Sequence, residues 1–160
     1  MAHQSENRKL AAELNLSVGR FFTQYAGLEN ALTSKRLEKD TWSLKEIIGH
    51  LIDSASNNHQ RFIRLQIVDQ LIFPDYGKDN LKWVRLRHYN DMDFADVILT
   101  WKQYNLVIGK IIERADASRL SNHWKTDGKE ITLKELMEDY LVHLKGHLTS
   151  FENTLRQLTT

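Results

Sequence analysis

The stretch TLKELMEDYLVHLKGHLTSFENTL, residues 132–155, decides the fold class of this chain. Thr132 followed three residues later by Glu135 is the capping-box pattern that begins a helix. The apolar residues that follow recur at steps of three and four, the spacing of one face of an amphipathic helix. They are Leu133, Leu136, Met137, Tyr140, Leu144, Leu148, Phe151, Leu155 and Leu158. This pattern predicts a long helix that packs one face against a core.

Two histidines, His143 and His147, lie four residues apart in this predicted helix. At that spacing both imidazoles leave the same face and can bind one metal ion. The zinc-protease motif has the same spacing with a glutamate between its histidines, whereas this chain has Leu144, Lys145 and Gly146 there. A metalloprotease is therefore disfavoured. An isolated pair can equally lie on a helix edge that faces water, so a metal site needs a third ligand elsewhere.

Three further segments show the helical spacing of apolar residues: residues 10–32, residues 43–65 and residues 93–112. The second of them begins with Ser43 as N-cap and Glu46 three residues later, again a capping box. Together with the helix after residue 132, they predict an all-α protein in which four helices form a bundle.

The connections between the predicted helices differ in length. Residues 70–91 form a long loop, and loops of that length in a compact protein are often functional. Asp127-Gly128, between two short extended runs, predicts a small β-hairpin before the last helix. With no repeats and no linkers, we expect residues 1–160 to form one four-helix-bundle domain.

Charge and composition limit the possible partners and ligands. The 160 residues carry a formal net charge of +1 and no cysteine. The balanced charge gives no indication of nucleic acid or of a membrane as partner. Without cysteine, any metal must be held by nitrogen and oxygen ligands. The polar N-terminus does not resemble a signal peptide, so we expect a cytoplasmic protein.

A third histidine, His50, flanks the apolar face of the second predicted helix and can therefore face the interior of the bundle. The helical row continues from it through Ser54, Asn57 and Arg61, at steps of four, three and four. A polar row that leads away from an inward histidine is what a solvated pocket inside a bundle requires. The same row can also be a helix edge facing water, and the spacing does not separate the two interpretations.

Three fragments, in this order, resemble signatures of the DinB-like superfamily, particularly of its YfiT-like branch. They are WSLKEIIGHLID (residues 42–53), FPDYGKDNLKWVRLRHYN (residues 73–90) and TLKELMEDYLVHLKGHL (residues 132–148). The resemblance implies a four-helix bundle of unusual connectivity, often a homodimer. It also implies a divalent metal ion bound by three histidines, which in this chain are His50, His143 and His147.

The resemblance also implies an enzyme that acts on a small-molecule substrate, with a low-molecular-weight thiol as a possible co-substrate. Better understood members of the family transfer such a thiol, for example bacillithiol or mycothiol, to an electrophile, and others have been regarded as probable hydrolases. Three neutral histidines leave an open coordination position, as in catalytic sites, and they suit Ni, Zn, Fe or Mn. The alternatives are a metal-dependent hydrolase using metal-bound hydroxide, and a non-enzymatic metal-binding bundle that acts as a dimer in a stress response.

Further residues are candidates around this site. Arg61 would bind a substrate carboxylate through its bidentate fork, with Asn57 beside it and Trp83 covering the site from the long loop. Asp53 is the candidate general base that hydrolysis would require. Asp53 and Asp139 also lie one turn from a histidine and could orient its imidazole, although a surface position is equally open for each.

Overall fold

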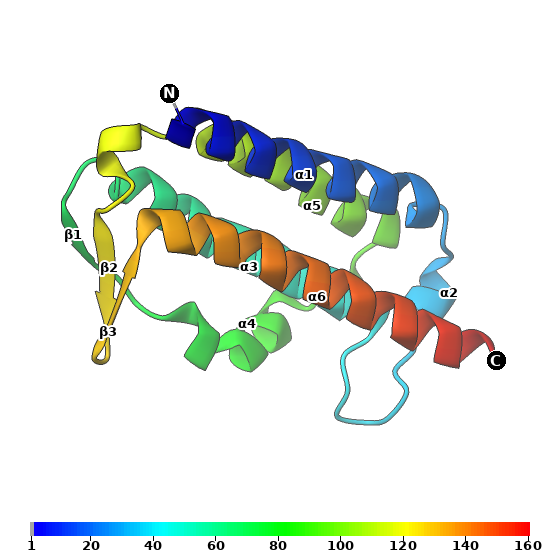
Figure 1. Ribbon diagram of the computed structural model, residues 1–160. Coiled ribbons are helices and arrows are strands. Elements are labelled where there is room, and N and C mark those ends of the chain that lie inside the picture. Colours follow the sequence, from blue (N-terminus) through cyan, green and yellow to red (C-terminus); the bar gives the residue numbers. More distant parts are fainter. Residues whose placement is uncertain (1) are drawn as a thin grey trace.

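Four long helices form the body of the molecule (Figure 1). They are α1 (Ala2–Tyr25), α3 (Leu44–Arg64), α5 (Phe94–Glu113) and α6 (Leu133–Thr159). The computed structural model describes residues 2–160, with side chains from residue 5 onward. The all-α four-helix bundle predicted from the sequence is confirmed. None of the helices in this described part combines the length and the apolar character of a membrane span.

Two of the helices begin with the capping boxes that the sequence predicts. At the start of α3 the Ser43 hydroxyl accepts a hydrogen bond from the Glu46 amide, and the Glu46 carboxylate accepts one from the Ser43 amide. Thr132 and Glu135 make the same pair of bonds at the start of α6. Each box satisfies amide groups that a helix start would otherwise leave unpaired, which fixes where the helix begins.

The first helix is shorter than its apolar pattern predicts. α1 ends at Tyr25, the chain turns at Ala26 and Gly27, and a separate short helix, α2 (Asn30–Thr33), follows. Glycine has one of the lowest helix propensities, which favours a break at this point. Leu28 still packs against the core beyond the turn. The apolar spacing therefore continues across the break between α1 and α2, so the spacing alone does not show where the helix ends.

Neighbouring helices α3 and α5 run parallel to each other. Near their first residues the Lys45 ammonium donates to the Met92 carbonyl at 2.6 Å, and beyond their last residues the Asp116 amide donates to the Gln66 side chain at 3.1 Å. Parallel neighbours cannot be joined by a short loop, since the chain must return along the whole bundle. Residues 65–93 make that return, and we call them the crossover.

The crossover contains more regular structure than the loop predicted there. It includes β1 (Gln70–Ile72), the 3₁₀ turns η1 (Tyr76–Lys78) and η2 (Tyr89–Asp91), and the short helix α4 (Asn80–Arg87). The predicted hairpin is present as β2 (His123–Thr126) and β3 (Lys129–Thr132), which pair antiparallel. β1 pairs with β2 in parallel, so the hairpin belongs to a three-stranded sheet that the sequence did not predict.

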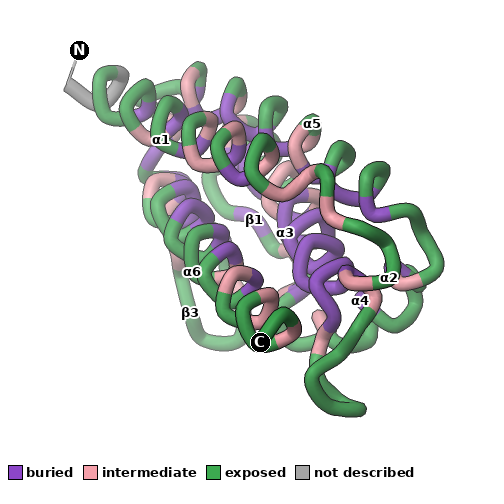
Figure 2. The backbone as a smooth tube through the Cα atoms, turned by 90° about the vertical axis from the view of Figure 1, so that its right-hand side faces the viewer, coloured by how far each residue is buried: buried purple, intermediate pink, exposed green. Residues whose placement is uncertain are grey.

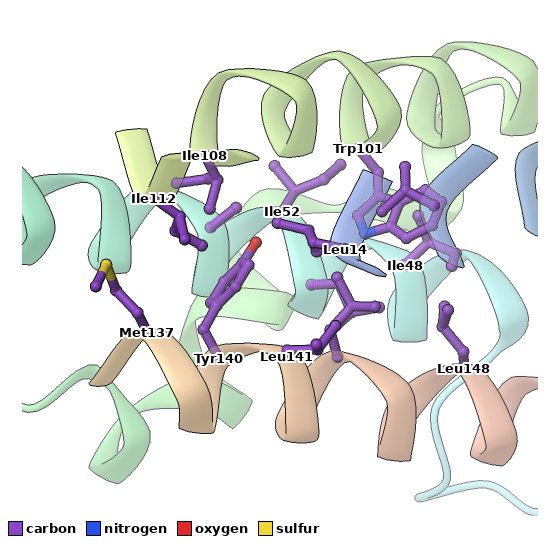
Figure 3. Close-up of a cluster of buried hydrophobic side chains, with 14 of the residues drawn as sticks. Leu14, Ile48, Ile52, Trp101, Ile108, Ile112, Met137, Tyr140, Leu141 and Leu148 are labelled. Atoms are coloured by element: carbon purple, nitrogen blue, oxygen red, sulfur yellow. The ribbon is translucent and has the colours of Figure 1, made fainter. Parts of the chain in front are cut away.

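The apolar core lies between α3, α5, α6 and α1 (Figure 3). α3 lies deepest, and Figure 2 shows it buried over most of its length. Gly49 illustrates how tightly the crossover packs on this helix. A Cβ atom at Gly49 would lie 2.1 Å from the Tyr89 ring, so only glycine allows this contact. The packing fixes η2 against the face of α3 next to His50.

Candidate metal centre

His50 on α3 meets His143 and His147 on α6. The Nε2 atom of His50 lies 3.2 Å from Nε2 of His143 and 3.1 Å from Nε2 of His147. One ligand atom from each of the three residues lies within 4.8 Å of the others. His50 is buried, His147 half-buried and His143 exposed, so the cluster opens toward the surface on its α6 side. The structure thus brings together the three residues that the sequence selected as metal ligands.

The second ring nitrogen of His50 has a partner on the crossover. Its Nδ1 lies 2.8 Å from the hydroxyl oxygen of Tyr76. Binding of a metal through Nε2 would place the proton on Nδ1, and in that tautomer Nδ1–H would donate its hydrogen bond to the Tyr76 oxygen. Such contacts fix the tautomer and the ring orientation of metal-binding histidines. Tyr76 therefore holds His50 so that its Nε2 lone pair faces the other two rings.

Burial keeps the three imidazoles neutral. It lowers the pKa of His50 to about 3, helped by the charges of protonated His147 and His143. Although part of the His143 side chain is exposed, desolvation of its ring by the surrounding protein, followed by the charge of His147, lowers its pKa to about 4. Burial also lowers the pKa of His147. At neutral pH all three rings are therefore unprotonated, which is the form that binds metal ions.

These residues fit a divalent metal ion. Nitrogen atoms 3.1 and 3.2 Å apart have the separation of adjacent ligands around one ion with metal–nitrogen distances of about 2.0–2.1 Å. Nickel, zinc, iron and manganese all accept imidazole ligands, so the histidines do not select among them. Three protein ligands leave at least one coordination position for a substrate or water.

Aromatic rings shield the cluster from water on two sides. The Trp42 ring centroid lies 4.8 Å from that of His50 and 6.3 Å from that of His147. The Tyr76 ring stacks on His50 at 5.9 Å, and Trp83 contacts Tyr76 edge-on at 5.3 Å. An apolar surround of this kind limits solvent access and strengthens electrostatic interactions at a metal site.

A cavity of about 230 Å³ adjoins the histidines. α3 lines it from His50 to Arg61, and α6 lines it from Leu136 to His143. The hairpin contributes Trp124, and the crossover covers the cavity with residues 75–77 and 80. A small molecule in this cavity would therefore lie against the open side of the histidine cluster.

The residues predicted to bind substrate are placed differently from one another. Arg61 lines the cavity, as the polar row from His50 suggests. Asn57 does not line the cavity, and its side-chain amide donates to the Asp53 backbone carbonyl at 2.9 Å. The neighbouring Asn58 lines the cavity instead. Trp83 does not line the cavity either, and its ring contacts the Tyr76 ring edge-on.

Asp53, the predicted general base, lies outside the cavity wall. Its Oδ1 accepts a hydrogen bond from the Tyr89 hydroxyl at 2.7 Å, and the Arg87 guanidinium lies 3.5 Å away. Burial raises the pKa of Asp53 although both neighbours oppose this. The carboxylate thus anchors the crossover to α3. Asp139, by contrast, does line the cavity, one turn before His143.

The hydrogen bond from His50 to Tyr76 and the place of Trp124 in the cavity were missed at the sequence level. Tyr76 lies in the second of the three fragments that resemble the DinB-like family, so a signal for its importance was present. Trp124 lies a few residues before the predicted hairpin turn, but nothing in the local pattern indicates which side of the hairpin faces the bundle.

Fold and site together define a class of protein: a four-helix bundle with two parallel neighbours joined by a crossover, and a three-histidine cluster between α3 and α6. The protein YfiT from Bacillus subtilis, described as a probable metal-dependent hydrolase with an unusual four-helix bundle topology, has this fold. It matches with a TM-score of 0.83 at 14% sequence identity, over 97% of this chain and 89% of the YfiT chain.

A second solved structure, the DinB-like protein YjoA from Bacillus subtilis, matches with a TM-score of 0.54 at 13% identity, over 99% of this chain and 87% of the YjoA chain. No family model matches the sequence, and no curated protein matches it. The two structures therefore confirm the four-helix-bundle fold that the resemblance to the DinB-like superfamily implies.

Proposed function

We propose that this chain is a divalent-metal-dependent enzyme that acts on a small molecule bound in the cavity beside the histidine cluster. The observation that carries the proposal is the convergence of three neutral Nε2 atoms, from His50, His143 and His147, next to a cavity of about 230 Å³. The fold shared with YfiT, a probable metal-dependent hydrolase, supports it.

Transfer of a low-molecular-weight thiol to an electrophile is the reaction that we propose first. A bound divalent ion would lower the pKa of a thiol that reaches it and so supply a thiolate nucleophile. The contact between Tyr76 and Nδ1 of His50 favours the tautomer that can bind the ion, and the Trp42 and Tyr76 rings cover two sides of the His50 ring. The cavity beside His50 and His143 would hold the thiol and the electrophile in contact.

Hydrolysis is the second candidate, and one observation favours it. Asp139 lines the cavity one helical turn before His143, where a carboxylate can accept a proton from water. The same ion would then activate water rather than a thiol. The two reactions use the same ligands and differ only in the nucleophile that enters the cavity.

Elemental analysis of purified, tag-free protein tests the metal centre. We expect about one divalent ion per chain in the wild type, and no ion in His50→Ala or His143→Ala. His59→Ala is the matched control, because His59 lies on the same helix but contacts Tyr104 instead. Circular dichroism should show that all variants keep their helices. Absence of metal from the wild type after reconstitution with nickel, zinc, iron or manganese would contradict the proposal.

Turnover then separates the candidate reactions. Metal-loaded protein is incubated with low-molecular-weight thiols and a model electrophile, and separately with activated esters, beside His143→Ala in both cases. Conjugation that requires a thiol and His143 supports thiol transfer, and ester cleavage that requires His143 supports hydrolysis. Stoichiometric metal without turnover on any of these substrates would favour the non-enzymatic metal-binding bundle.

A further inference from the structure

Arg61, which lines the cavity, is a buried cation without a full set of partners. The residue is only 6% exposed. Its Nη2 donates one hydrogen bond, to the Pro74 carbonyl at 3.2 Å. Its Nε is buried and has no hydrogen-bond partner among the described residues. A buried charge is costly unless it is paired and hydrogen-bonded, and the described part of the chain provides this guanidinium with no acceptor at Nε.

Asp75 does not supply that acceptor. Its Oδ1 lies 3.8 Å from Arg61 Nη2, beyond hydrogen-bond distance. The same oxygen accepts a hydrogen bond from the Gly77 amide at 2.9 Å, which caps η1 and holds the carboxylate in place. Asp75 therefore offsets part of the charge of Arg61 and leaves its Nε–H unpaired.

Trp124 holds the guanidinium in the cavity wall. Arg61 Cζ lies 3.9 Å from the centroid of the Trp124 ring. The ring is itself fixed, because its Nε1 donates to the Phe73 carbonyl at 2.8 Å. Stacking uses the face of the guanidinium and leaves its N–H edge for a planar acceptor such as a carboxylate. An arginine held in this way loses little conformational freedom when it binds an anion.

Arg61 and the histidines mark two ends of one cavity. Arg61 follows His50 by 11 positions on α3, which is about three helical turns, so both residues face the same side about 16 Å apart along the helix axis. Between them the cavity wall of α3 is polar, with Ser54 and Asn58. A ligand that reaches both ends must therefore be elongated.

We propose that Arg61 is the anion-binding end of the substrate site, and that the substrate carries a carboxylate at one end and its reacting group at the other. The inference rests on the proposed function, because it places the reacting group at the histidines. A carboxylate suits the site better than a phosphate dianion. Asp75 and Asp139 also line the cavity and would repel a second negative charge.

Isothermal calorimetry on zinc-loaded protein tests this inference with a series of ω-mercaptoalkanoates and the ω-mercaptoalkanols of equal length. The thiol is offered to the metal and the carboxylate to Arg61. At one chain length we expect the acid to bind at least about tenfold more tightly than the alcohol, as a charge-assisted hydrogen bond would provide. Arg61→Gln should abolish this difference and leave the affinity for the alcohol within about twofold.

Arg64→Gln is the matched control, since Arg64 is exposed on the same helix and bonds to Gln60. It should keep the preference for the acid. An equal loss in Arg64→Gln and Arg61→Gln would show a general effect of charge and overturn the inference. Equal binding of acid and alcohol to the wild type at every length would also overturn it, and this comparison needs no variant that might misfold.

The same titrations on metal-free protein distinguish this inference from the proposed function. If Arg61 binds the carboxylate, the metal-free protein should bind both compounds more weakly but should still bind the acid more tightly than the alcohol. Arg61→Gln should remove that difference. Failure to retain zinc would overturn the metal centre alone. Equal affinities of acid and alcohol in both forms of the protein would overturn the anion site alone.

Discussion

The contact between α1 and α5 and the contact between α3 and α6 are built on opposite principles. α1 and α5 meet through buried apolar residues such as Leu14, Val18 and Ile108, and the side chain of Asn15 packs against Gly109, where a Cβ atom would lie 2.5 Å from its Oδ1. α3 and α6 enclose three histidines, a buried arginine and a cavity. The first contact is largely apolar, whereas the second is polar and contains the cavity.

The difference separates stability from function within one bundle. Buried polar groups without a full set of partners, such as Arg61, lower the stability of the ligand-free protein, because part of their hydrogen-bonding capacity is unused. The apolar contact on the other side offsets that cost without contributing to the site. Substitutions in the two contacts should therefore change different measured quantities, and the predictions below use that contrast.

The largest effect is expected in the apolar contact. Leu14→Ala removes a fully buried side chain from α1 and should lower the free energy of unfolding by about 2–5 kcal/mol, through lost burial and the cavity left behind. Denaturant titration measures this. At low temperature, where the variant stays folded, it should still bind the same amount of metal as the wild type. Loss of metal by the folded variant would show that the two contacts are coupled.

Tyr76→Phe tests the polar contact. It removes the hydroxyl that fixes His50 Nδ1 and should weaken metal binding about 10- to 100-fold, while stability changes by at most about 1.5 kcal/mol. Competition with a chelator of known affinity measures the first quantity. Tyr25→Phe is the control, because it removes a hydroxyl bonded to Glu152, away from the histidines. Equal metal affinities for both variants would rule out the orienting role of Tyr76.

The metal-free protein should lose stability as the pH falls below about 6.5. The pKa of His50 is about 3 in the folded protein, lowered by burial from 6.5, so the unfolded chain takes up the proton first. Unfolding is therefore favoured increasingly between pH 6.5 and 3, by up to about 1.4 kcal/mol per pH unit for this residue. Denaturant titrations at several pH values should show a shallower slope for His50→Gln. A slope unchanged by the substitution would mean that His50 does not contribute.

The smallest expected effect lies beside the ligands themselves. Gly146 stands between His143 and His147 within α6, and a Cβ atom there would meet nothing within 4 Å. Gly146→Ala should therefore stabilise the protein by about 0.5–1 kcal/mol, because glycine costs more conformational entropy in a helix than alanine. Metal affinity should stay the same. Thermal unfolding and chelator competition check both parts, and a destabilised variant would indicate a backbone constraint at this position.

The four-helix bundle and the pairing of His143 with His147 were predictable because they depend on spacing along single helices. The starts of α3 and α6 followed from capping boxes, and the shared face of His143 and His147 followed from their separation of four residues. The choice of His50 as third ligand needed more than spacing. The spacing showed only that His50 can face inward, and the resemblance to a known family selected it.

The crossover was not predictable in the same way, because its structure depends on distant partners. β1 is three residues long and pairs with β2, some 50 positions later, so no local alternation marks it. α4 buries only Val84 among its residues and carries little amphipathic signal. The parallel direction of α5 and α3, which makes a crossover necessary, depends on how the helices pack together and cannot be predicted from the sequence of either helix alone.

The separation of the three histidines along the chain has a consequence for folding. His50 and His147 are 97 positions apart, yet their ring nitrogens lie 3.1 Å from each other. In a chain without cysteine, an ion bound there would act as a reversible cross-link that closes a very long loop. Binding only the folded form, it would raise the thermal transition with increasing metal concentration. A chelator would then be the counterpart of the reducing agent that opens a disulfide.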